Sequence, residues 1–124
     1  FGEGYWELAS NAYLFVETSG VGGTHPALVE AMAFGNCVVA HATPENQETV
    51  DNAGFLYDGT SGASALALLL QQLLDDPDLV AAYRQKAAAR AAAYYSWEKV
   101  TDEYEAMFKR LRPVTAAAVS RRNG

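Results

Sequence analysis

A glycine-rich stretch at residues 20–25, Gly-Val-Gly-Gly-Thr-His, is the part of this sequence best suited to hold a ligand. Glycine permits positive φ and lets a ligand approach the main chain closely. A helix should follow over residues 26–34, since proline begins it, glycine follows it, and Thr24 or His25 can cap it. Free N–H groups at a helix start, with the positive dipole end, attract anions. The pattern therefore predicts an anion site, with phosphate as the natural ligand.

Short apolar segments on both sides of this helix predict that it connects two strands. Residues 13–16 are typical of a buried strand, and residues 37–40 of a second strand after the helix. Such a strand, helix, strand order favours parallel pairing with a right-handed crossover. The glycine-rich loop would then lie at the carboxyl end of the first strand, where open α/β sheets bind their ligands.

The rest of the pattern adds one strand and several helices. We expect an α/β fold of a single domain over residues 1–112, with a short parallel sheet, flanking helices and a helical C-terminal part. Residues 113–124 are expected to form a flexible tail. The further segments are a helix at 3–11, helical turns at 44–50, a strand at 55–57, and helices at 63–74, at 77–94 after Asp76 and at 97–112 after the capping residue Ser96.

The composition describes an acidic chain whose charges are unevenly distributed. It has 124 residues, a net charge of −6, and no Lys or Arg before Arg84, which makes nucleic acid an improbable partner for the first part. The lone Cys37 lies in an apolar run, as expected of a small core residue in a reducing compartment such as the cytoplasm. No ligand spacing indicates zinc or calcium, so no metal is expected. No apolar run is long enough to span a bilayer.

The segment Pro26-Ala-Leu-Val-Glu-Ala-Met-Ala-Phe-Gly-Asn-Cys-Val-Val-Ala40 resembles a motif of retaining GT-B glycosyltransferases, roughly P-x-L-E-A-M-A-x-G-x-P-V-V-A. The preceding Val-Gly-Gly-Thr-His is similar to a rhamnosyltransferase-type branch. The resemblance implies the C-terminal, Rossmann-like domain that binds a nucleotide-sugar donor, here without its first strands. It also implies a separate N-terminal domain, a glycan or lipid-linked glycan acceptor, and a cytoplasmic location or one at the inner membrane face.

The resemblance assigns donor-binding roles to individual residues. Glu30 matches a glutamate that accepts hydrogen bonds from the donor ribose, although a plain helix acid is the alternative. Gly22, Gly23 and Thr24 match the loop whose amides meet the diphosphate or the sugar, and an ordinary turn is the alternative. For His25, a contact to a phosphate or sugar oxygen and a packed or capping ring are equally open.

Downstream, Thr43 resembles a donor contact of the family, although turn polarity explains it equally well. One departure from the family pattern concerns a second glutamate that holds the transferred sugar. Its expected position falls on Gly22 or Gly20, and Glu17 could replace it only if the strand end bends toward the site. The catalytic residues are not identified by the sequence.

Charge leads to a further expectation about the isolated segment. GT-B enzymes of this kind need no bound metal, so neither a metal nor another cofactor is expected, and cations or helix dipoles must balance the diphosphate. The family's basic pair would lie upstream of this segment. We therefore expect weak donor binding, no catalysis by the segment alone, and self-association through the edge of the first strand or the last helix.

Two alternatives remain open. A related GT-B epimerase or phosphorylase acting on nucleotide sugars or glucans would use the same loop and helix. A non-enzymatic α/β interaction domain would present the acidic first half as a solvated face and the helix around residues 66–70 as a partner surface.

Overall fold

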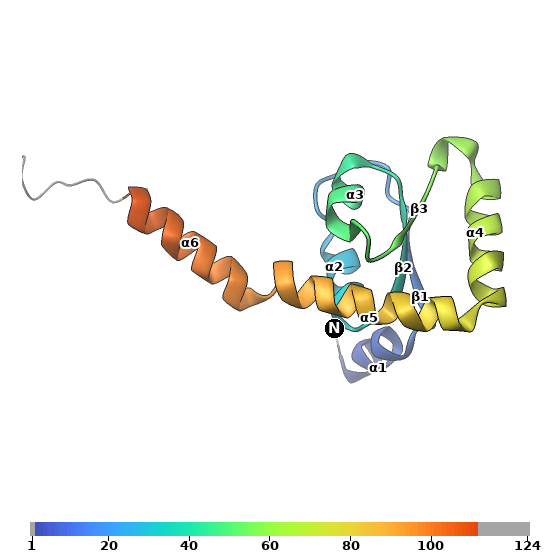
Figure 1. The fold of residues 1–124 in the computed structure, drawn as a ribbon, viewed down its shortest axis with the longest axis horizontal. Coiled ribbons are helices and arrows are strands. Elements are labelled where there is room, and N and C mark those ends of the chain that lie inside the picture. Colours follow the sequence, from blue (N-terminus) through green and yellow to red (C-terminus); the bar gives the residue numbers. More distant parts are fainter. Residues whose placement is uncertain (1, 112–124) are drawn as a thin grey trace, which may run out of the picture.

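The computed structural model describes residues 2–111, so the expected tail at 113–124 lies outside the described residues. Six α-helices, three strands and one short 3₁₀ helix follow one another in these residues (Figure 1). In chain order they are α1 (Glu3–Asn11), β1 (Leu14–Glu17), α2 (Pro26–Ala33), β2 (Cys37–His41), α3 (Pro44–Val50), β3 (Phe55–Tyr57), η1 (Gly59–Ser61), α4 (Ala63–Asp75), α5 (Pro77–Tyr94) and α6 (Trp97–Leu111).

The three strands form a parallel sheet in the order β1-β2-β3, which confirms the expected α/β fold. Strand β1 is displaced by one residue from the predicted 13–16, because its pairing starts with Leu14 opposite Cys37. The carbonyl of Tyr13 instead accepts a hydrogen bond from Arg84 at 3.4 Å. Strand β2 extends one residue beyond its prediction, to His41, which pairs with Tyr57 of β3.

Alternate residues of the central strand face opposite sides of the sheet, and each side has its own core. Val38 and Ala40 belong to one cluster with buried residues of α2, α3 and α5, whereas Cys37 and Val39 belong to another. The first cluster also contains Leu28, Ala31, Met32, Val50, Ala53, Ala87 and Ala91, and the second also contains Tyr57, Leu73 of α4 and Val80 of α5. The sheet is therefore covered on both faces, as a parallel sheet requires.

Helix α5 lies across the amino end of the sheet (Figure 1). Arg84 on this helix donates a hydrogen bond to the carbonyl of Ala12, just before β1, at 2.9 Å. Gly35, just before β2, has positive φ and lies close to Ala88 of the same helix. The carboxyl end of the sheet is left to the loops after the strands.

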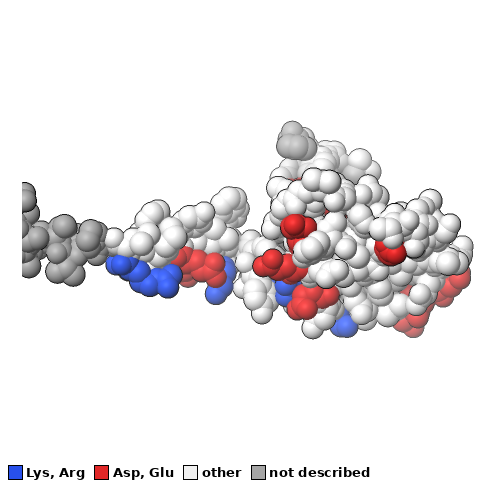
Figure 2. Space-filling model, turned by 90° about the horizontal axis from the view of Figure 1, so that it is seen from above, with Lys and Arg blue, Asp and Glu red and all other residues white. Residues whose placement is uncertain are grey.

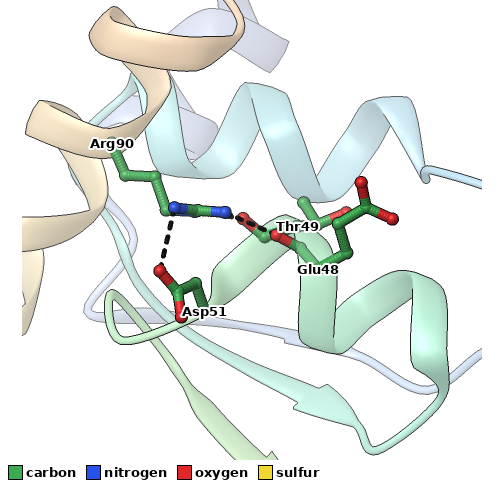
Figure 3. A network of polar contacts seen from close by, with 4 residues as sticks. All are labelled: Glu48, Thr49, Asp51 and Arg90. Atoms are coloured by element: carbon green, nitrogen blue, oxygen red, sulfur yellow. Dashed lines mark hydrogen bonds and ion pairs between the residues drawn. The ribbon is translucent and has the colours of Figure 1, made fainter.

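A second arginine on α5 holds helix α3 in place (Figure 3). Arg90 Nε donates to the carbonyl of Thr49 at 2.7 Å, and its other nitrogens contact the carbonyl of Glu48 and the carboxylate of Asp51. A guanidinium at the C-terminus of a helix satisfies carbonyls that lack partners within the helix and complements the dipole.

Helix α6 points away from the rest of the molecule (Figure 1). Its N-terminus is capped by Ser96, whose hydroxyl accepts a hydrogen bond from the Lys99 amide at 3.1 Å, as predicted. The ion pairs Lys99–Glu103 and Lys109–Glu105 lie on its charged side, which Figure 2 shows as a row of blue and red. Aromatic and apolar side chains of this helix are exposed: Trp97, Tyr104, Phe108 and Leu111.

Candidate functional site

The loop between β1 and α2 carries most of the residues expected to bind a ligand, and Glu17 shapes its beginning. Glu17 is buried, and its Oε1 accepts a hydrogen bond from the Ser19 amide at 2.8 Å. Burial disfavours the charged form of Glu17, but hydrogen bonds from Ser19, with a smaller coulombic effect of the nearby His25, outweigh it and lower the pKa of Glu17. Glu17 is therefore an ionised residue that binds its own loop.

Gly22 is the loop position at which glycine is required. Its φ of 139° is strained for any other residue, and a Cβ placed there would lie 3.0 Å from Cε1 of His25. Gly23 has open space on the corresponding side. Gly22, Gly23 and Thr24 are all exposed, so the main chain of this loop is accessible to a ligand.

His25 occupies the N-cap position of α2, but its side chain makes no capping hydrogen bond, so the prediction that Thr24 or His25 caps the helix through its side chain is wrong. The ring lies close to Gly22 instead. The amides of Leu28 and Val29 bond only to the carbonyl of His25, at 3.1 and 3.2 Å.

Glu30 lies on α2 and is fixed by a residue far from it in sequence. The hydroxyl of Tyr5 on α1 donates a hydrogen bond to Oε2 of Glu30 at 2.5 Å. This bond, burial and the charge of Glu30 all raise the pKa of Tyr5. Glu30 and Thr24 line one cavity of about 660 Å³, which Trp97 and Tyr95 also border. The structure thus brings two of the predicted residues together.

Thr43 begins α3 and has a clear structural role. Its hydroxyl oxygen accepts a hydrogen bond from the Asn46 amide at 3.2 Å, which caps the helix. Helix capping accounts for a Thr at this position, and a contact to a donor stays a prediction.

His41 is a candidate residue that sequence reasoning missed. It ends β2, and its ring lies on Tyr57 with the centroids 5.6 Å apart. His41 and Tyr57 border another cavity of about 220 Å³, together with Thr18 directly after β1 and Gly59 after β3. A polar residue directly after an apolar strand was the signal that could have revealed it, because carboxyl ends of parallel strands carry the ligand sites of such folds.

Comparison with known proteins identifies the class of protein that this fold and loop define. The profile of the Glycosyl transferases group 1 family matches residues 3–90, and the chain belongs to this family. Among solved structures, the chain is similar to a sucrose-phosphate synthase from Thermosynechococcus elongatus, with 27% sequence identity and a TM-score of 0.69. The similarity covers 77% of this chain but only 25% of that one, so the chain corresponds to about a quarter of that enzyme. No curated protein matches the chain.

The comparison places the three-stranded sheet and its helices as a fragment of a Rossmann-like GT-B domain. Within residues 2–111, no helix combines the length and the apolar character needed to cross a membrane.

Proposed function

We propose that this chain is the donor-binding part of a retaining GT-B glycosyltransferase, which moves a sugar from a nucleoside-diphosphate sugar to a glycan or lipid-linked glycan. The glycine-rich loop suggests the rhamnosyltransferase-like branch, with a role in polysaccharide biosynthesis in the cytoplasm or at the inner membrane face. The observation that carries the proposal is the position of Glu30. Its carboxylate is held by Tyr5 at a cavity that Thr24 also lines, one helical turn beyond the glycine-rich loop.

In this arrangement each group has a distinct task. A carboxylate offers two oxygens with about four acceptor sites, so Glu30 can bind Tyr5 and still accept two ribose hydroxyls. The exposed amides of Gly22 and Gly23, with the hydroxyl of Thr24, would bind the diphosphate, as helix starts commonly do. His25 would donate to a phosphate or sugar oxygen. Neither a metal nor another cofactor takes part in this proposal.

The charges of the chain support only weak binding by this part alone. No Lys or Arg precedes Arg84, and Arg84 is engaged at the opposite end of the sheet. We therefore propose millimolar affinity for nucleoside diphosphates, about −4 kcal/mol. Sugar transfer would require a second domain that holds the acceptor, since aligning two substrates supplies about 7–11 kcal/mol of the barrier reduction.

Titration of the chain with UDP, ADP, GDP and dTDP, followed by amide NMR, tests this proposal. Signals of residues 20–25 and of Glu30 should move, and Glu30→Gln should weaken binding of the best ligand by at least about tenfold, because a charge-assisted hydrogen bond is lost. Glu45→Gln is the matched control, since Glu45 is an acid in the first turn of α3. Equal affinity of Glu30→Gln and the unchanged chain would make Glu30 a plain helix acid.

A further inference from the structure

We propose that the cavity beside His41 binds a phosphate group, with the protonated imidazole as its positive charge, so that this binding weakens as pH rises. The inference rests on the proposed function, since it assigns to His41 the diphosphate of the donor. It adds a residue and a pH dependence that the glycine-rich loop alone does not supply.

The His41 ring lies close to two glycines from separate loops. A Cβ on Gly20 would lie 3.3 Å from Nδ1 of His41, and one on Gly59 would lie 2.3 Å from Nε2. The imidazole thus lies between the loop after β1 and the segment after β3. A Cβ at position 59 would overlap the ring, and one at position 20 would be in tight contact with it. Its side chain is partly exposed, so a ligand can reach it.

The lining of the cavity suits a phosphate. Besides His41, it consists of the hydroxyl-bearing Thr18 and Tyr57, three glycines, and two apolar residues of α4. Glycines expose main-chain amides at close range, and phosphates are bound by such amides together with hydroxyls and a cation. The lining glycines are Gly20, Gly59 and Gly62.

The charges around the ring leave histidine as the local cation. Asp58, which directly follows β3, accepts hydrogen bonds from Thr60 and Ser61. These bonds, with a smaller contribution from His41, lower the pKa of Asp58, as hydrogen bonds from Ser19 do for Glu17 at the end of β1.

The carboxylates of Asp58 and Glu17 therefore stay ionised between pH 5.5 and 8, so neither changes its charge in that range. On α3, the uncharged Asn46 donates a hydrogen bond to the His41 carbonyl at 3.0 Å. On α4, the uncharged Ala63 and Leu66 line the cavity. The only other histidine is His25, whose ring lies over Gly22. Histidine ordinarily changes its charge within this same pH range.

Titration with pyrophosphate at pH 5.5 and pH 8, followed through the imidazole and amide NMR signals of the full 124-residue chain, tests the inference. The His41 ring signals should move, and affinity should be about tenfold higher at pH 5.5, the scale of one charge-assisted hydrogen bond. Pyrophosphate itself gains negative charge as pH rises, which by itself would favour binding at pH 8. Tighter binding at pH 5.5 must therefore originate in the protein.

Two variants test whether His41 causes the pH dependence of pyrophosphate binding. His41→Asn should lose the pH dependence, whereas Glu48→Gln, which removes an exposed acid of α3, should keep it. His41→Gln is a second variant if His41→Asn does not fold. The inference is wrong if pyrophosphate moves the amides of residues 20–25 without moving the His41 ring, a result that leaves the donor site intact. Movement of the ring supports it even if Glu30→Gln leaves nucleotide affinity unchanged, which would refute the ribose contact instead.

Discussion

The hydroxyl of Tyr5 donates a hydrogen bond to the carboxylate of Glu30, 25 residues further along the chain, and so ties α1 to α2. The aromatic ring of Trp6 strengthens this contact by packing edge-on against Phe34, with the ring centroids 5.3 Å apart. An acid that only served its own helix would point into solvent. Glu30 is instead oriented by a second element, which the proposed ribose contact would require.

This contact predicts the titration of a tyrosine. Because the bond to Glu30 raises the pKa of Tyr5, the neutral amide of Glu30→Gln should let Tyr5 titrate at a lower pH. The signal of its ring carbon next to the hydroxyl, followed by ¹³C NMR from pH 8 to 12, measures the change. Glu7→Gln, an exposed acid on α1, is the control and should leave the titration of Tyr5 unaltered. Identical curves for Glu30→Gln and the unchanged chain would show that the contact does not form in solution.

A second prediction concerns the arginine that holds α3. Arg90→Met keeps the stem but removes the donors to the carbonyls of Thr49 and Glu48, so the free energy of unfolding should fall by about 2–3 kcal/mol. Asp51→Asn should cost less than about 1 kcal/mol, because Asp51 is 61% exposed in its ion pair. Urea unfolding measures both. Equal losses of unfolding free energy would mean that Arg90 stabilises the fold through its ion pair with Asp51 and not through the carbonyls at the end of α3.

A third prediction tests the close packing of Gly54 against buried residues of β2 and α3. A Cβ on Gly54 would lie 2.6 Å from Cγ2 of Val38 and 3.1 Å from Cβ of Val50, both fully buried. Gly54→Ala should therefore destabilise the fold by about 1–3 kcal/mol. Gly23→Ala is the matched control, since open space surrounds that position, and its thermal midpoint should stay unchanged. A Gly54→Ala variant as stable as the control would contradict the close packing.

The fourth prediction follows from the buried thiol. Burial raises the pKa of Cys37 to about 11, outweighing the opposite effect of Arg84, and the thiolate is the reactive form. Iodoacetamide at pH 8 should therefore modify Cys37 only after unfolding. The folded state favours the protonated thiol, so its contribution to stability is complete below pH 9 and is lost as pH rises from 9 to 11. Cys37→Ala should lose less stability across that interval, and rapid labelling of the folded chain would refute the burial.

Self-association is the fifth prediction. Strand β1 is an edge of the described sheet, and Tyr104 and Phe108 are exposed on α6. Both surfaces favour pairing with a second chain. Sedimentation equilibrium should show a mass that rises with concentration, and Phe108→Lys should reduce this rise if α6 is the contact. A mass that stays monomeric at all concentrations contradicts the prediction.

Local patterns were sufficient to predict the three strands and six α-helices of the described residues, but not the short helix η1. Helix α3 and strand β3 have the predicted bounds, since Pro44 and the turn after Val50 are strong local signals. The parallel sheet followed from the order of strands and helices. The one-residue displacement of β1 could not be predicted, because it depends on pairing with Cys37 and on Arg84, 71 residues beyond Tyr13.

The candidate site was less predictable for the same physical reason. Glu30 stood out through its motif, but its partner Tyr5 lies on another helix and only folding brings the two together. His41 carried no motif, and its position depends on two glycines that approach it from separate loops. The side-chain capping expected of His25 failed because its ring packs over Gly22, a tertiary effect that no local rule contains.

The strand order has a consequence for where a ligand crevice can form. In open α/β sheets the crevice opens at a topological switch point, where successive strands begin to be added in the opposite direction. The order β1-β2-β3 advances in one direction only, so the three described strands contain no such point. A further parallel strand beside β1, with its connecting helix on the α4 face, would create the switch point directly at residues 18–25. Under the proposed function, the glycine-rich loop is expected to form one side of a ligand crevice and a neighbour of β1 the other.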